Sequence, residues 1–424
     1  MATTRRQFIK RGLGMVTVSV ALPHLWLSGA RAQSPDPDRK ILIVLELLGG
    51  NDGLNTVVPY TDSRYYSFRP TLGIKEAELK TVQGQSTIIS DRFGLHPSMG
   101  QMKTLYDAGR VAIVQGVGYP EPSLSHFLSA DIWHTTNLAG KGDGWLGRYA
   151  ETALAGRPGL SAVSIGSRPP KTFTSSKVVV PNIFNFDLYS FQTDQKYTSN
   201  RSRQLDTFNA LYSRSFPEEN FASAVSNIGL DAVTGAGRIG QAPTNYRSTV
   251  VYPANNPLAA GLKMLAQIIT AIPEARLLYV QMGFFDHHGQ QIAGPTSKLT
   301  GQHATLLQNF SDGVKAFYDD MLEHELADKV LIMQWSEFGR RPNENNSLGT
   351  DHGTSSSLFI IGNPVAGGFY GQQPSLEATA LDEAGNMKFT VDFRSVYATV
   401  IDDWLGGDSR EVLGARYENV GFIR

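Results

Sequence analysis

The sequence predicts an α/β fold in which a doubly wound, mostly parallel sheet carries helices on both faces. Short apolar runs of strand length recur along the chain, which is typical of parallel strands buried on both faces. Longer segments between them repeat their apolar residues at helical spacing. The chain has 424 residues and is 41% hydrophobic, which is enough for one large core.

The predicted strands are marked by apolar composition and by the turn residues that follow them. Lys40–Leu48 is the strongest, and Gly49-Gly50 ends it with a turn that lets the backbone approach a ligand closely. From Arg276 to Trp335 the pattern is strand, helix, strand, which predicts a parallel pair with a right-handed crossover. The predicted strands are Lys40–Leu48, Arg110–Gln115, Ala162–Ile165, Lys177–Val180, Arg276–Met282, Val330–Trp335 and Ser357–Ile361.

The predicted helices alternate with these strands. Between about residues 160 and 255 the periodic signal weakens, and we expect an inserted cap region there that helps to set the substrate. The predicted helices are Met99–Ala108, His126–His134, Ser202–Arg214, Leu258–Ile272, His303–Met321 and Thr390–Leu405.

The first 32 residues have the pattern of an export signal rather than of a folded element. Thr4-Arg5-Arg6-Gln7-Phe8-Ile9-Lys10 is a twin-arginine signature, a weakly apolar stretch follows, and Ala30-Arg31-Ala32 fits a cleavage site. We therefore expect the twin-arginine translocase as a partner, a periplasmic or otherwise exported product, and one domain over residues 33–424. The alternative is a short membrane anchor, but Pro23 and His24 interrupt the apolar run.

Composition excludes several classes of function. Removing the five basic residues of the signal leaves 33 basic against 39 acidic residues, a net charge of −6, so nucleic acid is not an expected partner. The chain has no cysteine, which excludes disulfides, thiolate metal sites and cysteine nucleophiles. No later segment is long and apolar enough to predict a membrane span, so none is expected after cleavage.

Acidic residues and histidines follow several of the predicted strands. Asp52, Asp286 and Glu337 each stand just past a strand, and Asp351-His352 precedes another. Parallel strands bring their carboxyl ends to one edge of a sheet, so these side chains are expected to converge. Clustered carboxylates repel one another unless a cation offsets them. The pattern therefore predicts a divalent metal. Imidazole with carboxylate suits zinc or manganese, and carboxylate alone suits calcium or magnesium.

Two serines precede the predicted helix at His126. Near a helix N-terminus the free N–H groups favour an anion, so Ser125, with Ser123 as its rival, is the candidate nucleophile. The alternative is that either serine simply caps the helix, since serine is a preferred N-cap residue.

These residues also carry a resemblance to a known family. In order along the chain, the segments are Arg5-Arg6, LLGGNDGLN, SLSHF, GFFDHHGQQ, SEFGRR and TDHG. They resemble a large bacterial family of twin-arginine-exported proteins, the domain of unknown function numbered fifteen-oh-one, over nearly the whole mature chain. That family is grouped with the alkaline phosphatase–sulfatase superfamily. The resemblance implies an alkaline phosphatase-like sheet with metal–ester chemistry at its strand ends.

The resemblance also implies roles for single positions. Asp52 resembles the first metal carboxylate of the superfamily, Ser125 resembles its nucleophile, and Asp286 with His288 resembles the Asp and His of one metal site. His352 resembles the late metal histidine, with Asp351 beside it. Glu337 departs from the pattern, because it follows Ser336 where a paired Asp-His is usual. The chain also has no Cys/Ser-x-Pro-x-Arg sulfatase signature. One metal, a different metal and no metal therefore stay as alternatives.

The sequence thus predicts an exported, metal-dependent hydrolase or transferase of phosphate or sulfate esters, acting on a small-molecule or polysaccharide ester. The first alternative is a non-catalytic periplasmic or cell-surface protein of the same fold, used for binding or assembly. A serine esterase of the α/β-hydrolase type would need a Gly-x-Ser-x-Gly turn, which the sequence lacks.

Overall fold

The computed structural model describes residues 38–80, 86–154, 160–186, 189, 193–194, 196–214 and 221–424. The predicted export signal of residues 1–32 lies outside this part of the chain. Within the described part, no helix has the length and apolar character needed to cross a membrane.

One large sheet organises the chain. Among the described residues it contains nine strands in the order β12-β4-β11-β8-β1-β7-β5-β6, and β13 pairs with β4. Most neighbours are parallel, and β11 alone runs antiparallel, to β4 and to β8. The strands are β1 Ile41–Leu47, β4 Val111–Gly118, β5 Ala162–Ile165, β6 Asn182–Ile183, β7 Leu277–Met282, β8 Val330–Trp335, β11 Ser356–Ile361, β12 Gly368–Gly371 and β13 Val391–Asp392. The predicted fold class, an α/β fold with a mostly parallel sheet, is confirmed.

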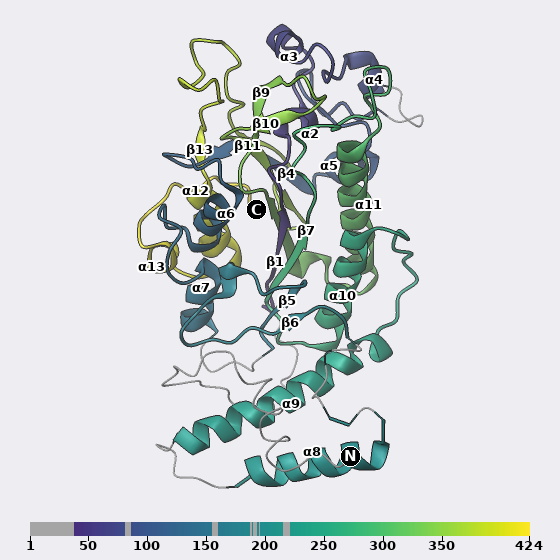
Figure 1. Cartoon of the computed structure of the whole chain (residues 1–424), viewed down its shortest axis with the longest axis vertical. Helices are drawn as coiled ribbons and strands as arrows, with labels where there is room; N and C mark the ends of the chain where they lie inside the picture. The colour runs from purple at the N-terminus through teal and green to yellow at the C-terminus, as the bar shows by residue number, and fades with distance from the viewer. Residues whose placement is uncertain are drawn as a thin grey trace.

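Helices cover both faces of this sheet (Figure 1). One face packs against α5, α10 and α11, and the other against α6, α7, α12 and α13. These helices are α5 Gly100–Asp107, α6 His126–Thr135, α7 Trp145–Ala153, α10 Pro257–Ala271, α11 Gln302–Glu323, α12 Phe393–Thr399 and α13 Ser409–Leu413. The last predicted helix is shorter than expected, because α12 passes into a π-helical turn at Val400–Leu405.

Alternation along β1 divides the core into two layers. Ile41, Ile43 and Leu45 belong to the layer under α10 and α11, whereas Leu42 and Val44 belong to the layer under α6 and α12. All five side chains are fully buried. This is the reason why the run shows no polar alternation, since a central parallel strand has no solvent face.

The connections and small elements contain the main differences from the sequence predictions. Lys177–Val180 is not a strand, and β6 forms just beyond it. β7 and β8 are parallel but not neighbours, because β1 lies between them. The weakly periodic region holds two helices that project below the sheet in Figure 1, namely α8 Thr198–Tyr212 and α9 Phe221–Asn245. Its role as a cap stays a prediction.

Smaller elements surround the carboxyl ends of the central strands, at the top of Figure 1. The segment after β8 folds into an antiparallel hairpin instead of the expected loop. These elements are α2 Gly53–Thr56, α3 Ser63–Phe68, α4 Glu76–Lys80, the β2–β3 pair Val57–Val58 and Gly94–Leu95, and the β9–β10 pair Arg340–Glu344 and Thr350–His352.

The loops after β1 and β7 meet closely at this end of the sheet. Gly49 has φ +123°, and a Cβ there would lie 2.5 Å from the backbone nitrogen of Asp286. Gly50 has φ +71°, and a Cβ there would overlap the ring of Phe338. Only glycine fits at either position, so the Gly49-Gly50 turn brings the strand ends together.

Candidate metal centre

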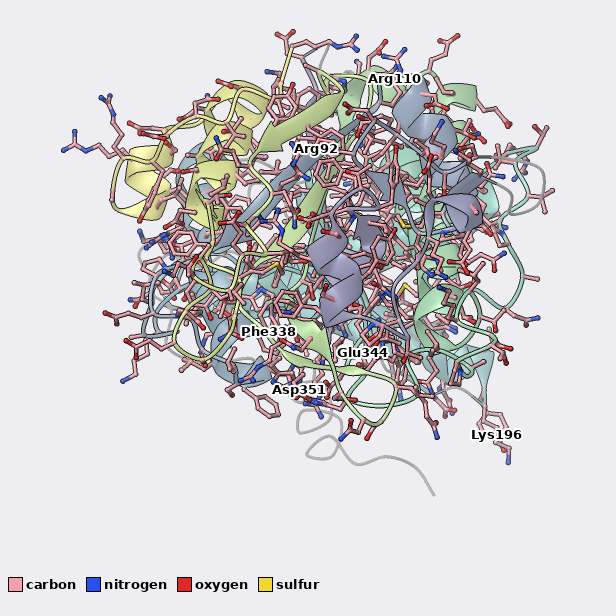
Figure 2. All side chains as sticks on the ribbon, turned by 90° about the horizontal axis from the view of Figure 1, so that it is seen from above. Arg92, Arg110, Lys196, Phe338, Glu344 and Asp351 are labelled. Atoms are coloured by element: carbon pink, nitrogen blue, oxygen red, sulfur yellow. The ribbon has the colours of Figure 1, made fainter. Side chains whose placement is uncertain are left out.

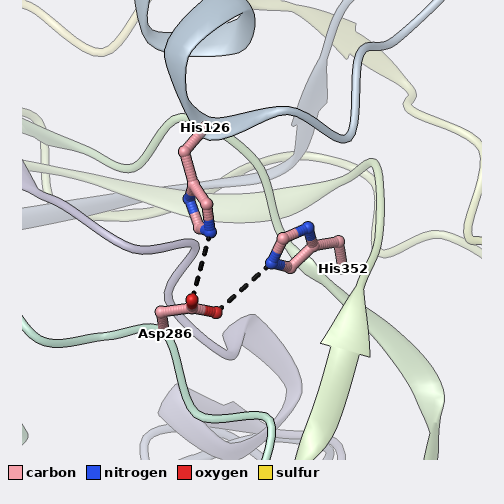
Figure 3. Close-up of side chains that lie close together, drawn as sticks. All are labelled: His126, Asp286 and His352. Carbon is pink, nitrogen blue, oxygen red and sulfur yellow. Dashed lines mark hydrogen bonds and ion pairs between the residues drawn. The ribbon is translucent and has the colours of Figure 1, made fainter.

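Three side chains from distant parts of the sequence meet at this edge of the sheet (Figure 3). His126 comes from the start of α6, Asp286 from the loop after β7, and His352 from the end of β10. His126 Nε2 lies 3.3 Å from Asp286 Oδ2, and His352 Nε2 lies 3.2 Å from Asp286 Oδ1. The three ligand-type atoms all lie within 4.8 Å of one another. We call these three residues, together with His288, the Asp286 cluster.

His288 extends the group from the same loop as Asp286. Its Nε2 lies 2.8 Å from His352 Nε2 and 3.2 Å from Asp286 Oδ1. The Phe338 ring, which is labelled in the view from above (Figure 2), packs 4.6 Å from that of His352. The structure thus brings together the predicted residues Asp286, His288 and His352.

The hydrogen bonds of the three histidines direct the same ring atom inward. His126 Nδ1 lies 2.7 Å from Glu337 Oε1, His352 Nδ1 lies 2.8 Å from the carbonyl of Leu124, and His288 Nδ1 lies 3.2 Å from Asp351 Oδ1. Carbonyl and ionised carboxylate oxygens only accept hydrogen bonds, so each Nδ1 is the donor. In all three rings Nε2 is therefore the atom that faces the Asp286 carboxylate.

The spacing of these atoms fits a metal ion. Ligands about 2.0–2.1 Å from zinc at tetrahedral angles are about 3.3–3.4 Å apart. The observed separations from Asp286 to the histidine nitrogens are 3.2 and 3.3 Å. His126 Nε2 is buried and has no hydrogen-bond partner. The donor set of imidazole and carboxylate, and a buried ring nitrogen without a hydrogen bond, are therefore suited to a divalent cation.

Glu337 lies behind His126 rather than beside Asp286. Its side chain is fully buried, and it accepts hydrogen bonds from the backbone N–H of Gly49 and from Ser336 as well as from His126. The hydrogen bond to Glu337 raises the pKa of His126 and outweighs the opposing effect of partial burial. Glu337 therefore holds the ring of His126, and its predicted role as a metal ligand stays a prediction.

Arg340 compensates the charge of Asp286. Its guanidinium is buried and donates to Asp286 Oδ1 at 2.7 Å, and also to the carbonyls of Gly49, Gly50 and Thr350. Burial alone would raise the pKa of Asp286, but the hydrogen bond and the positive charge of Arg340 more than offset it and lower the pKa to about 2. Asp286 is therefore ionised at neutral pH, and its side chain is 46% exposed.

Asp52 lies outside this cluster. It is buried and forms an ion pair of 2.6 Å with Arg69, and it also accepts a 2.6 Å hydrogen bond from Gln291. Burial raises the pKa of Asp52, but the charge and hydrogen bond of Arg69 more than offset it, so the pKa is about 2. The role of Asp52 as a metal ligand stays a prediction, and the positive charge that balances it here is a guanidinium.

The two candidate nucleophiles lie next to the cluster without joining it. Ser125 is the N-cap residue of α6, its side chain makes no capping hydrogen bond, and it directly precedes His126. Ser123 accepts a 3.2 Å hydrogen bond from the backbone N–H of Ser125. Asp351 holds His288 and is itself half-exposed. The nucleophile assignments stay predictions.

Sequence reasoning missed His126, Arg340 and Arg69. In the segment SLSHF, the prediction uses only the serine hydroxyls. The histidine of this segment also lies in a loop region past the end of a strand, as His352 does, and that position could have indicated a ligand. SEFGRR contains Arg340 beside the predicted Glu337, so its position was available. Nothing in the sequence pairs Arg69 with Asp52.

The family comparison covers almost all of the folded part of this molecule. Residues 39–414 match the family model described as "Protein of unknown function (DUF1501)". The chain belongs to this family. No protein of curated function matches it in sequence.

Among solved structures, the chain is similar to the lipoteichoic acid synthase LtaP from Listeria monocytogenes, with 8% identity and a TM-score of 0.35 over 92% of this chain and 77% of that one. It is also similar to the soluble domain of lipooligosaccharide phosphoethanolamine transferase A from Neisseria meningitidis, with 10% identity and a TM-score of 0.36 over 92% and 96%. An alkaline phosphatase from the Antarctic bacterium TAB5 has 9% identity and a TM-score of 0.30 over 77% and 92%.

Proposed function

We propose that this protein is an exported, metal-dependent hydrolase or transferase of phosphate or sulfate esters. His126, His288, His352 and Asp286 hold the metal, and an imidazole-rich set of this kind favours zinc or manganese over calcium or magnesium. Export through the twin-arginine translocase is part of the proposal. It rests on the pattern at Thr4–Lys10, outside the described residues.

One observation carries the metal site. The Nε2 atoms of His288 and His352 are 2.8 Å apart, and both face an ionised carboxylate. The other nitrogen of each ring donates its hydrogen to an oxygen, so two lone pairs would face each other if both rings are neutral. Such an arrangement is unfavourable unless a proton or a cation lies between the atoms, and a metal ion satisfies all of them at once.

The chemistry follows from what a metal supplies and from what lies beside it. A bound divalent cation would polarise an ester oxygen and lower the pKa of a nearby hydroxyl or water. In the first step the P–O or S–O bond to the leaving alcohol breaks, a bond forms to the attacking serine oxygen, and the serine proton passes to the leaving oxygen. Water, or an acceptor hydroxyl in a transferase, then attacks the esterified serine, takes the phosphoryl or sulfuryl group and returns a proton to the serine oxygen. Ser125, exposed at the N-terminus of α6, is the proposed attacking group, and Ser123 is its rival.

Elemental analysis of protein purified without chelator tests the site. The wild type is expected to carry metal, and Asp286→Asn and His352→Gln are expected to lose it. His324→Gln is the matched control, because His324 pairs with Asp320 in α11, away from the cluster. Equal metal content in all four proteins would reject the site.

Activity is tested separately on p-nitrophenyl phosphate and p-nitrophenyl sulfate. We expect turnover by the metal-loaded wild type and its loss in Asp286→Asn. Ser125→Ala is expected to abolish turnover while metal stays bound. Loss in Ser123→Ala with activity retained in Ser125→Ala would instead assign the nucleophile to Ser123.

The second candidate is a non-catalytic binding or assembly protein of the exported compartment. The observation in its favour is that neither serine hydroxyl forms a hydrogen bond with a residue of the Asp286 cluster in the described part of the chain. A protein that binds metal in the wild type but cleaves no ester of either class supports this candidate.

A further inference from the structure

A chain of hydrogen bonds connects the segment of the candidate serines with the segment that carries Glu337. The backbone N–H of Ser123 donates to the hydroxyl of Tyr119 at 3.1 Å. That hydroxyl lies 2.6 Å from the hydroxyl of Ser129, which in turn donates to the backbone carbonyl of Glu337. Tyr119 and Ser129 are both buried, so the middle of the chain is shielded from water. The start of α6 and the end of β8 are therefore joined through one tyrosine.

The donors and acceptors of this chain have one consistent assignment. A backbone carbonyl only accepts, so the hydroxyl hydrogen of Ser129 is used by Glu337. Tyr119 therefore donates its own hydrogen to Ser129, and its oxygen accepts from the N–H of Ser123. The contact of this hydroxyl with the carbonyl of Ser123 is longer, at 3.4 Å. Burial raises the pKa of Tyr119, so the hydroxyl stays protonated at neutral pH and is able to donate.

The same hydroxyl closes the turn that leads from β4 to the serines. We call residues Pro120–Ser125 the serine loop. Within it, Glu121 lies between two prolines and has φ +53°, in the left-handed region that a glutamate seldom adopts. Strained backbone of this kind persists only where the surrounding structure holds it. Tyr119 directly precedes the loop and Ser123 lies beyond the strained residue, so their hydrogen bond spans the turn.

The serine loop contacts the Asp286 cluster at its far end. The carbonyl of Leu124 accepts a hydrogen bond from Nδ1 of His352 at 2.8 Å. Within the loop, Ser123 Oγ accepts from the backbone N–H of Ser125 at 3.2 Å, so fixing Ser123 also fixes the backbone of Ser125. A displacement of about 1 Å at a reacting group can lower a rate about 100-fold. The position of this loop therefore matters for either candidate nucleophile.

We propose that Tyr119 is a positioning residue, whose hydroxyl holds the serine loop so that the attacking serine stays aligned with the Asp286 cluster. It acts through the backbone of Ser123 and through Ser129, and it contacts neither the ester nor the metal. The effect on turnover rests on the proposed function, whereas the restraint on the loop does not. Tyr119→Phe should lower kcat by about 10–100-fold, while KM and metal content stay at their wild-type values.

Hydrogen exchange tests the restraint without any substrate. Tyr119→Phe removes the acceptor of the Ser123 N–H but keeps the ring, which packs 5.9 Å from that of Phe393. Tyr397→Phe is the matched control, because Tyr397 is also buried and packs 5.2 Å from Phe393. Its hydroxyl donates to the carbonyl of Trp133 and not to the serine loop. We expect the amide of Ser123 to exchange about tenfold faster in Tyr119→Phe only. Unchanged exchange at this amide overturns the proposal.

Turnover of p-nitrophenyl phosphate or sulfate separates the positioning role from the proposed function. If the wild type cleaves either ester, we expect a lower kcat with unchanged KM in Tyr119→Phe and wild-type values in Tyr397→Phe. Ser129→Ala should also lower kcat, with no further loss when it is combined with Tyr119→Phe, because both changes break one chain.

Two kinetic results would overturn the positioning role. One is an unchanged kcat in Tyr119→Phe, and the other is an equal loss of kcat in Tyr119→Phe and Tyr397→Phe. A wild type that cleaves neither ester rejects the proposed function instead. In that case the exchange of the Ser123 amide still decides whether Tyr119 holds the serine loop.

Discussion

Asp52 and Asp286 stand just past the ends of two neighbouring strands, β1 and β7, yet their surroundings differ. Asp52 is buried against Arg69, and the buried histidines His96, His287 and His303 lie around it. Asp286 is half-exposed and is faced by the Nε2 atoms of three histidines. The same residue type at equivalent strand ends thus has two different environments.

The difference lies in how the negative charge is balanced. At Asp52 a permanent cation from the protein satisfies the carboxylate, and burial holds that cation in place. At Asp286 the guanidinium of Arg340 contacts Oδ1, while Oδ2 faces His126, and the side chain is 46% exposed. A carboxylate enclosed with its cation is suited to holding the fold, and a half-exposed one among imidazoles has the surroundings of a metal ligand.

The largest expected effect is loss of stability at the buried pair. Arg69→Met leaves Asp52 buried without its cation and should lower the free energy of unfolding by about 3–5 kcal/mol. Arg64→Met is the control on the preceding helix, where the pair with Asp62 is exposed to solvent and should contribute much less to stability. Urea unfolding measures both, and equal losses would contradict the comparison.

Glu337→Gln is expected to have an intermediate effect, on metal affinity. Residues that hold a metal-binding histidine typically contribute 10–100-fold. Because Glu337 raises the pKa of His126, protons compete with metal at this ring, and affinity should fall as pH falls through that raised pKa. In Glu337→Gln the loss of metal affinity on acidification should occur at lower pH than in the wild type.

Isothermal titration at several pH values measures this change. Glu344→Gln is the control, because Glu344 also accepts hydrogen bonds from backbone N–H groups, those of Thr71 and Leu72, without contacting a histidine. If both variants bind metal like the wild type, Glu337 has no part in holding the site.

The smallest expected effect, per histidine and over the first pH unit below 6.5, is a pH dependence of stability from buried neutral histidines. Burial lowers the pKa of His96 to about 4 and that of His134 to about 3. The unfolded chain takes up these protons at about pH 6.5, so stability is complete above that pH and falls as the pH drops toward the folded values. Each histidine should contribute about 1 kcal/mol per pH unit in this window. His96→Gln should flatten the slope, and an unchanged slope would contradict the assignment.

The sequence predicts those parts of the fold that produce a local pattern of apolar residues along the chain. β1, β7 and β8 are visible because a buried strand needs a continuous apolar run, and the acids past their ends follow from parallel geometry. The hairpin of β9 and β10 escapes prediction because it is polar and lies outside the main sheet. Asp52 pairs with Arg69, and Glu337 pairs with His126. Such pairings between side chains do not produce a periodic pattern in the sequence, so they could not be predicted from it.

The central position of β1 has a consequence for how the chain is made. Gly49, at the end of this strand, meets Glu337, which is 288 residues later. Both neighbours of β1 are late strands, so neither edge has a native partner until β7 has left the ribosome, and the second edge stays open until β8 has followed. At about 5–20 residues per second this interval lasts roughly 15–60 s. During synthesis, one of the most apolar segments of the protein must therefore be shielded from aggregation by other means.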